Sequence, residues 1–176
     1  MSRLRLKLAV GVAVVGVAAT TAAAIAGDRA QLRTSLSGYE EVPAVSSTGG
    51  GDFRAAIDRH SDTIRYRLSF SGIEGNTLQS HIHLGQKGVN GGITVFLCSN
   101  LGNGPAGTQA CPQSGTIEGT ITPEDVLSPS PTQGLAAGEF DELVRALRAG
   151  VTYVNVHSST SPGGEIRGQI ENRQND

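Results

Sequence analysis

Short runs in which apolar and polar residues alternate dominate the chain. The clearest covers residues 63–70, where Ile64, Tyr66, Leu68 and Phe70 alternate with Arg65, Arg67 and Ser69. A period of two predicts a half-buried β-strand. Further strands are predicted at Gln31–Leu36, Gly51–Asp58, Leu78–Leu84, Ile93–Cys98, Gly115–Ile121, Val151–His157 and Glu165–Ile170. About eight short strands separated by glycine-rich turns indicate an all-β sandwich or barrel.

One segment departs from this pattern. Residues 139–149 place Phe140, Leu143, Val144 and Leu147 at helical spacing, and Gly150 follows as a residue suited to end a helix. The sequence therefore predicts one short helix there. A helical turn is also expected after Thr122, because Pro123 stands at the first helical position.

Composition supports a single small domain. The chain has 176 residues, 24 of them glycine, and only 17% are charged. These values exclude a coiled coil, a charge-rich disordered chain and a disulfide-dense mini-protein. A formal net charge of −2 offers no basic surface for nucleic acid, so no nucleic-acid partner is expected.

The N-terminus has the pattern of a secretory signal. Arg3, Arg5 and Lys7 precede Leu8–Ala26, which carries no charge and ends in Ala24-Ile25-Ala26, a small-x-small cleavage site. We predict that residues 1–26 are a signal peptide, and that residues 27–176 form one exported domain with a frayed tail at 171–176. Its location would be periplasmic or extracellular, with no membrane insertion after cleavage. An uncleaved N-terminal anchor is the alternative, since 19 residues could just cross a bilayer.

The predicted export affects how the two cysteines are interpreted. Cys98 and Cys111 enclose a loop rich in glycine, asparagine and proline. In an oxidising compartment we expect them to form one disulfide. The competing interpretation, a metal thiolate, would need one of them reduced.

Three of the four histidines could meet at one point. In a strand over 78–84, His81 and His83 share the polar face and stand about 7 Å apart at Cα. In a strand over 151–157, His157 also lies on the outer face. His60 falls in a predicted turn and is expected to be solvated. If the two strands are neighbours, three imidazoles converge; otherwise these are surface histidines.

Three neutral imidazoles suit Cu(II) or Zn(II), with water in the remaining position. A blue-copper site is not expected, because it needs a free thiolate. No acid-rich loop has the spacing of an all-oxygen Ca²⁺ site. Protonation should compete with the metal, so affinity is expected to fall below about pH 6.5.

Three segments resemble the CHRD domain family, which is named after chordin. Residues 36–43 (LSGYEEVP) are similar to its opening motif, and residues 81–85 (HIHLG) to its central one. Residues 153–157 (YVNVH) and 161–170 (SPGGEIRGQI) resemble its closing motif. The resemblance extends over about residues 32–170, with the motifs in the family's order.

This resemblance implies a Greek-key β-sandwich similar to immunoglobulin domains and to copper–zinc superoxide dismutase. By that analogy His81, His83 and His157 become ligands of copper, in preference to zinc. The full dismutase is not implied, because only His60 remains for a zinc half-site and its bridging ligand.

Residues beside the histidines have two interpretations each. Glu165 and Arg167 lie two apart in the last predicted strand, where they could orient His157 or form a surface ion pair, which we favour. Asn155 could line the site or complete the outer face. Glu41 is expected in a solvated turn.

The sequence thus predicts an exported copper-binding protein that holds one ion through three histidines. Two alternatives stand beside it: an extracytoplasmic protein-interaction module without metal, and a copper-dependent redox enzyme. The lack of a nucleophile motif and of a complete dismutase site favours a protein that is not an enzyme.

Overall fold

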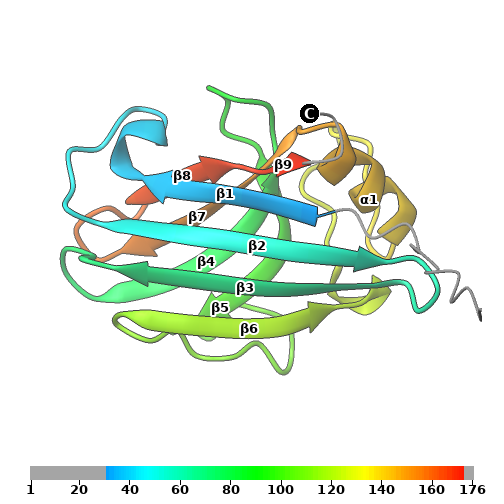
Figure 1. Ribbon diagram of the computed structural model, residues 1–176, viewed down its shortest axis with the longest axis horizontal. Coiled ribbons are helices and arrows are strands. Elements are labelled where there is room, and N and C mark those ends of the chain that lie inside the picture. Colours follow the sequence, from blue (N-terminus) through cyan, green and yellow to red (C-terminus); the bar gives the residue numbers. More distant parts are fainter. Residues whose placement is uncertain (1–30, 173–176) are drawn as a thin grey trace, which may run out of the picture.

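The structure is a computed structural model, which describes residues 31–172. These residues form two crossing layers of antiparallel strands (Figure 1). The predicted signal peptide at 1–26 and residues 173–176 of the predicted tail lie outside the described part.

The first layer has the strand order β1-β2-β3-β6, and the second has the order β5-β4-β7-β8. The first layer consists of β1 (Gln31–Ser37), β2 (Gly50–Asp58), β3 (Thr63–Ser71) and β6 (Gly115–Ile121). The second consists of β5 (Gly92–Ser99), β4 (Thr77–Leu84), β7 (Thr152–Ser158) and β8 (Ile166–Gln169). The predicted strands are therefore present, and each of their bounds is within one residue of the predicted one.

A short contact joins the two layers into one sheet, because Ser37 of β1 pairs with Arg167 of β8. Residues 171–172 form a ninth strand, β9 (Glu171–Asn172), which pairs with β1. The prediction of a frayed tail was thus wrong for these two residues. Strands that are neighbours but not consecutive, such as β3 with β6 and β4 with β7, give the sandwich its Greek-key connectivity. The all-β fold class is confirmed.

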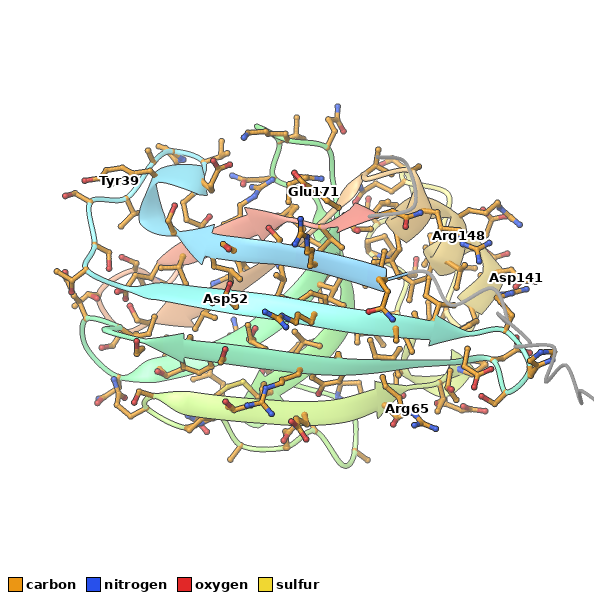
Figure 2. All side chains as sticks on the ribbon, viewed as in Figure 1. Tyr39, Asp52, Arg65, Asp141, Arg148 and Glu171 are labelled. Atoms are coloured by element: carbon orange, nitrogen blue, oxygen red, sulfur yellow. A yellow bond between two sulfur atoms is a disulfide. The ribbon has the colours of Figure 1, made fainter. Side chains whose placement is uncertain are left out.

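The apolar faces of the two layers meet in the core. Phe53 and Leu68 of the first layer and Ile82, Val154 and Val156 of the second are fully buried. Polar side chains such as those of Asp52 and Arg65 lie on the outer surface (Figure 2). Alternation along each strand therefore places the core where the period of two predicted it.

One end of the sandwich carries the predicted helix, α1 (Phe140–Arg148). Phe140, Leu143, Val144 and Leu147 are its buried residues. Gly150 has φ of +68°, a conformation that glycine adopts without strain, directly after the helix. The helical turn expected after Thr122 is the 3-10 helix η2 (Pro123–Asp125), and Thr122 and Asp125 form a reciprocal capping box there. A second 3-10 helix, η1 (Gly38–Glu40), follows β1.

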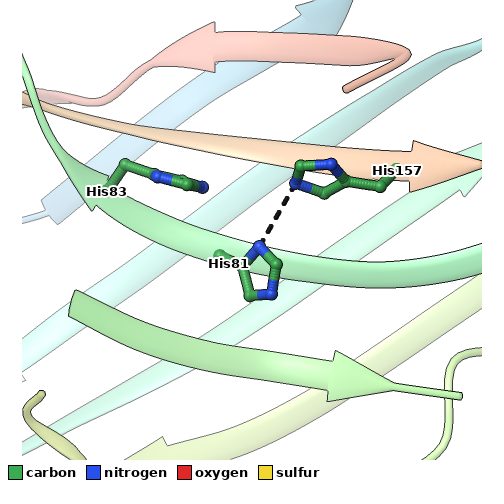
Figure 3. Close-up of side chains that lie close together, drawn as sticks. All are labelled: His81, His83 and His157. Atoms are coloured by element: carbon green, nitrogen blue, oxygen red, sulfur yellow. Dashed lines mark hydrogen bonds between the residues drawn. The ribbon is translucent and has the colours of Figure 1, made fainter. Parts of the chain in front are cut away.

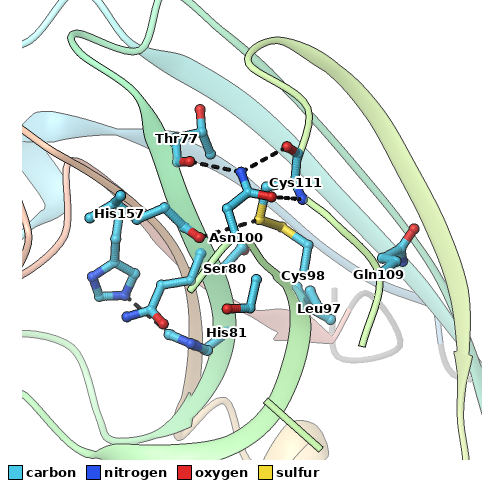
Figure 4. Close-up of a disulfide and its surroundings, with 12 residues drawn as sticks. Thr77, Ser80, His81, Leu97, Cys98, Asn100, Gln109, Cys111 and His157 are labelled. Atoms are coloured by element: carbon cyan, nitrogen blue, oxygen red, sulfur yellow. Dashed lines mark hydrogen bonds between the residues drawn. A yellow bond between two sulfur atoms is a disulfide. The ribbon is translucent and has the colours of Figure 1, made fainter. Parts of the chain in front are cut away.

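Cys98 and Cys111 form the predicted disulfide, which closes the loop after β5 (Figure 4). Asn100 fixes this loop: its side chain accepts a hydrogen bond from the Cys111 amide and donates to the carbonyls of Thr77 and Cys111. A disulfide is typical of proteins that fold in an oxidising compartment. Within residues 31–172, no helix is long and apolar enough to cross a membrane.

Candidate metal centre

The three histidines lie on neighbouring strands, on the face of the second layer that points away from the core. In the pairing of β4 with β7, His81 lies opposite Asn155, His83 opposite Tyr153, and Gln79 opposite His157. The expected arrangement of neighbouring strands is therefore present. The three rings lie on the outer face, as predicted, but that face is covered, because the exposed fractions of His81, His83 and His157 are only 0%, 7% and 6%. His60 is exposed, as predicted.

The three rings converge on one point (Figure 3). One ring nitrogen from each ring lies within 4.8 Å of the other two. The shortest approach joins Nδ1 of His81 to Nε2 of His157, at 3.2 Å. Four-coordinate zinc or copper with metal–nitrogen distances of about 2.0–2.1 Å would separate neighbouring ligand atoms by about 3.3 Å. The pair His81–His157 already has this spacing.

Backbone carbonyls fix which nitrogen of two rings carries hydrogen. Nδ1 of His83 lies 3.0 Å from the carbonyl oxygen of Gly91, and Nδ1 of His157 lies 2.9 Å from that of Pro162. A carbonyl oxygen can only accept, so both Nδ1 atoms donate. In the neutral rings, each Nε2 then carries a lone pair. Both lone pairs face the point of convergence.

His81 differs, because no carbonyl fixes its hydrogen. Its Nδ1 faces Nε2 of His157, while its buried Nε2 has no hydrogen-bond partner. The ring packs edge-on against Phe96, with ring centroids 4.4 Å apart. In the neutral protein His81 Nδ1 can donate to the lone pair of His157 Nε2, so this hydrogen bond and the packing against Phe96 hold the ring, while the unpartnered Nε2 is costly.

The histidines are neutral over a wide pH range. Burial, followed by the nearby His157 and His83, lowers the pKa of His81 to about 2. Burial is also the main cause that lowers the pKa of His83, to about 4, although the hydrogen bond to Gly91 opposes it. The pKa of His157 is lowered for the same reason, against the hydrogen bond to Pro162. Neutral imidazole is the form that binds metal.

A stack of planar groups supports His83. The Tyr153 ring lies parallel to the His83 ring at 4.6 Å between centroids, and the Arg167 guanidinium lies 3.3 Å from the Tyr153 centroid. The Arg167 guanidinium also donates to the Val89 carbonyl and to Asn90 Oδ1. Arg167 thus fastens the loop after β4, which carries Gly91, over the site.

Glu165 and Arg167 do not form the surface ion pair that the sequence analysis favoured. Both are buried, and they form no salt bridge with each other. Glu165 Oε1 accepts hydrogen bonds from Ser47 Oγ and the Glu74 amide. Nor does Glu165 orient His157, because the Pro162 carbonyl occupies Nδ1 of that ring.

Glu41 is a residue of the site that the sequence analysis missed. It was expected in a solvated turn, yet its side chain is 6% exposed and packs against Gly164. Burial raises the pKa of the Glu41 carboxyl to about 7, although Arg167 and hydrogen bonds from Val42 and Asn155 lower it in part. The motif around residue 41 marked this position, but its polarity gave no sign of burial.

The Asn155 side chain contacts two of the three imidazole rings. Its Oδ1 is 3.0 Å from Nε2 of His157 and 3.1 Å from Nε2 of His83. The sequence analysis placed Asn155 beside the site without a defined role. In the structure, Asn155 lies within the candidate metal centre, in contact with His83 and His157.

Comparison with known proteins confirms the family resemblance of the sequence motifs. The family model described as CHRD domain matches residues 32–170, which is most of the chain. No curated protein and no solved structure matches it. Because this match includes all three histidines and both layers of the sandwich, the chain belongs to the CHRD domain family.

Proposed function

We propose that this protein binds one copper ion through His81, His83 and His157, as an exported copper-binding protein. The observation that supports this most directly is the convergence of one nitrogen from each ring within 4.8 Å. Two of these rings have their Nδ1 hydrogens held by carbonyls, so their lone pairs are aimed inward before any ion arrives. Outer hydrogen bonds of this kind are usual at histidine-metal sites.

The choice of copper rests on the donor set. Among divalent first-row ions, an imidazole site binds Cu(II) most tightly, and Zn(II) is the next candidate. Export removes the protein from the cytosol, and the disulfide is consistent with that location. We propose that the protein acts outside the cytosol, either in the periplasm or outside the cell.

Burial favours binding over catalysis. The exposed fractions of His83 and His157, 7% and 6%, leave little room for a substrate to approach the metal from solution. A superoxide assay on the copper-loaded domain tests the redox alternative directly.

Calorimetric titration with Cu(II) tests the proposal on the folded protein. The variant with all three histidines changed to alanine should lose the site, whereas His60→Ala should bind as the wild type does, because His60 is an exposed turn residue. Circular dichroism confirms that each variant is folded. Equal Cu(II) affinity in the triple variant and the wild type would refute the proposal.

Membership of the CHRD family supports a second candidate, an extracellular protein-interaction module. Tyr39 in η1 is 74% exposed, and Val89 in the loop after β4 is 41% exposed. The Asn90 side chain, next to Val89, donates a hydrogen bond to the Val42 carbonyl in the segment after η1. Binding of a purified partner that survives a chelator and is lost in Tyr39→Ala would favour this function.

A further inference from the structure

Three electron-pair donors meet at Asn155 without a hydrogen between them. Nε2 of His83 and Nε2 of His157 carry lone pairs, because the carbonyls of Gly91 and Pro162 hold the Nδ1 hydrogens. The Asn155 Oδ1 atom, which can only accept, lies 3.1 Å and 3.0 Å from these two nitrogens. Such an arrangement is repulsive in a neutral protein and is favourable around a cation.

The oxygen end of the Asn155 amide faces the two rings. The buried Glu41 carboxyl lies near the same side chain, and its Oε1 atom has no hydrogen-bond partner. A carboxylate oxygen can only accept, so the amide nitrogen is the end of Asn155 that suits the side of Glu41.

The distances fit a four-coordinate ion. Along the path His81 Nδ1, His157 Nε2, Asn155 Oδ1 and His83 Nε2, successive atoms are 3.2, 3.0 and 3.1 Å apart. Neighbouring ligand atoms of such a site are about 2.8–3.4 Å apart when metal–ligand bonds are about 2.0–2.1 Å, from square-planar to tetrahedral geometry. The three measured spacings all lie in this range.

We propose that Asn155 Oδ1 is the fourth ligand of the metal, and that it makes the site selective for divalent ions over Cu(I). This inference rests on the proposed function, since it needs the three histidines to bind metal. A carbonyl oxygen is a hard donor, which suits Zn(II) and Cu(II) better than the soft Cu(I) ion. Three imidazoles alone would satisfy Cu(I) without it.

The test compares Zn(II) and Cu(I) affinities in the wild type, Asn155→Ala and Asn155→Asp. Asn155→Ala should weaken Zn(II) binding by about tenfold or more and change Cu(I) binding by less than about threefold. Asn155→Asp supplies a charged oxygen and should restore or exceed wild-type Zn(II) affinity. Gln79→Ala is the matched control, because Gln79 lies opposite His157 but bonds Asn103 rather than the rings.

A second measurement is independent of affinity. The side-chain ¹⁵N resonance of Asn155 should shift when diamagnetic Zn(II) is added to the labelled protein, and that of Gln79 should not. Equal weakening of Zn(II) and Cu(I) in Asn155→Ala would overturn the inference, because a disturbed site affects both ions. Unchanged Zn(II) affinity in Asn155→Ala would also overturn it. Absence of metal binding in the wild type would instead refute the proposed function itself.

Discussion

The rings of His81 and His157 face each other across neighbouring strands, with Nδ1 of His81 3.2 Å from Nε2 of His157 and an angle of 63° between the ring planes. His81 belongs to β4, and His157 belongs to β7, on the far side of a long crossover that contains α1. An ion bound by both rings would join these two segments of the chain. Metal binding should therefore stabilise the whole sandwich.

Saturation with Cu(II) is expected to raise the free energy of unfolding of the wild type. A free ion concentration of a hundred times Kd corresponds to about 2.7 kcal/mol. The same increase is expected in His60→Ala and none in His157→Ala. Urea unfolding with and without Cu(II) measures it. A full increase in His157→Ala would show that the ion binds elsewhere.

Glu41→Gln should change how stability depends on pH. The pKa of Glu41 is raised to about 7 in the folded protein and is about 4.5 when unfolded, so its favourable contribution is present below pH 4.5 and is lost as the pH rises through 7. Relative to the wild type, Glu41→Gln should therefore gain stability between pH 5 and pH 8, by up to about 3 kcal/mol. Urea unfolding at both pH values measures the difference. A Glu41→Gln stability curve that runs parallel to that of the wild type from pH 5 to pH 8 would contradict the raised pKa of Glu41.

The fold could be predicted from the sequence because each strand has a local pattern. Residues 63–70 alternate strictly, and β3 has the buried face that this alternation requires. The layer partners were harder to predict. Strand β4 lies between β5 and β7, and β7 follows only after the α1 crossover, a long-range pairing that no local pattern records.

The candidate site was only partly predictable. The spacing of His81, His83 and His157 placed them on one face, but it could not show that loops cover that face. The groups that orient the rings are the backbone carbonyls of Gly91 and Pro162. The direction of a backbone carbonyl cannot be predicted from the type of residue that carries it. Glu41 was missed for a related reason, since residues that lie near it in the fold, Arg167, Asn155 and Gly164, are more than a hundred residues away in sequence.

Metal binding should persist at lower pH than the sequence suggested. The sequence placed the loss of affinity below about pH 6.5, the ordinary pKa of imidazole, but burial lowers the pKa of all three rings, that of His83 to about 4. Protons therefore compete with the metal only at more acid pH. In Glu41→Gln, which removes the other group that titrates nearby, Zn(II) affinity should change by less than about threefold between pH 7.5 and 5.5. A tenfold fall over that interval would contradict the lowered pKa values.

Gly91→Ala should weaken both the fold and the metal site. A Cβ atom at this position would lie 1.6 Å from the Leu84 carbonyl oxygen, so the backbone must move, and with it the carbonyl that holds His83. We expect a loss of at least about 2 kcal/mol in stability and of about tenfold in Cu(II) affinity. Gly163→Ala is the control, because its Cβ would meet nothing within 4 Å. Unfolding and calorimetric titration measure the two effects, and unchanged Cu(II) affinity in folded Gly91→Ala would show that the carbonyl does not position His83.

Removal of the disulfide should lower stability without changing metal affinity. Cys98 and Cys111 are 13 residues apart, and closing a loop of this size contributes about 3 kcal/mol by restricting the unfolded chain. Cys98 pairs with Ser80, whose side chain points to the face of β4 opposite to that of His81, so the sulfurs cannot reach the imidazole nitrogens. The double variant Cys98→Ala, Cys111→Ala should therefore unfold at lower urea concentration and still bind Cu(II) with wild-type affinity at temperatures where it is folded. A large loss of Cu(II) affinity in the folded variant would revive a thiolate as ligand, the alternative that the sequence alone left open.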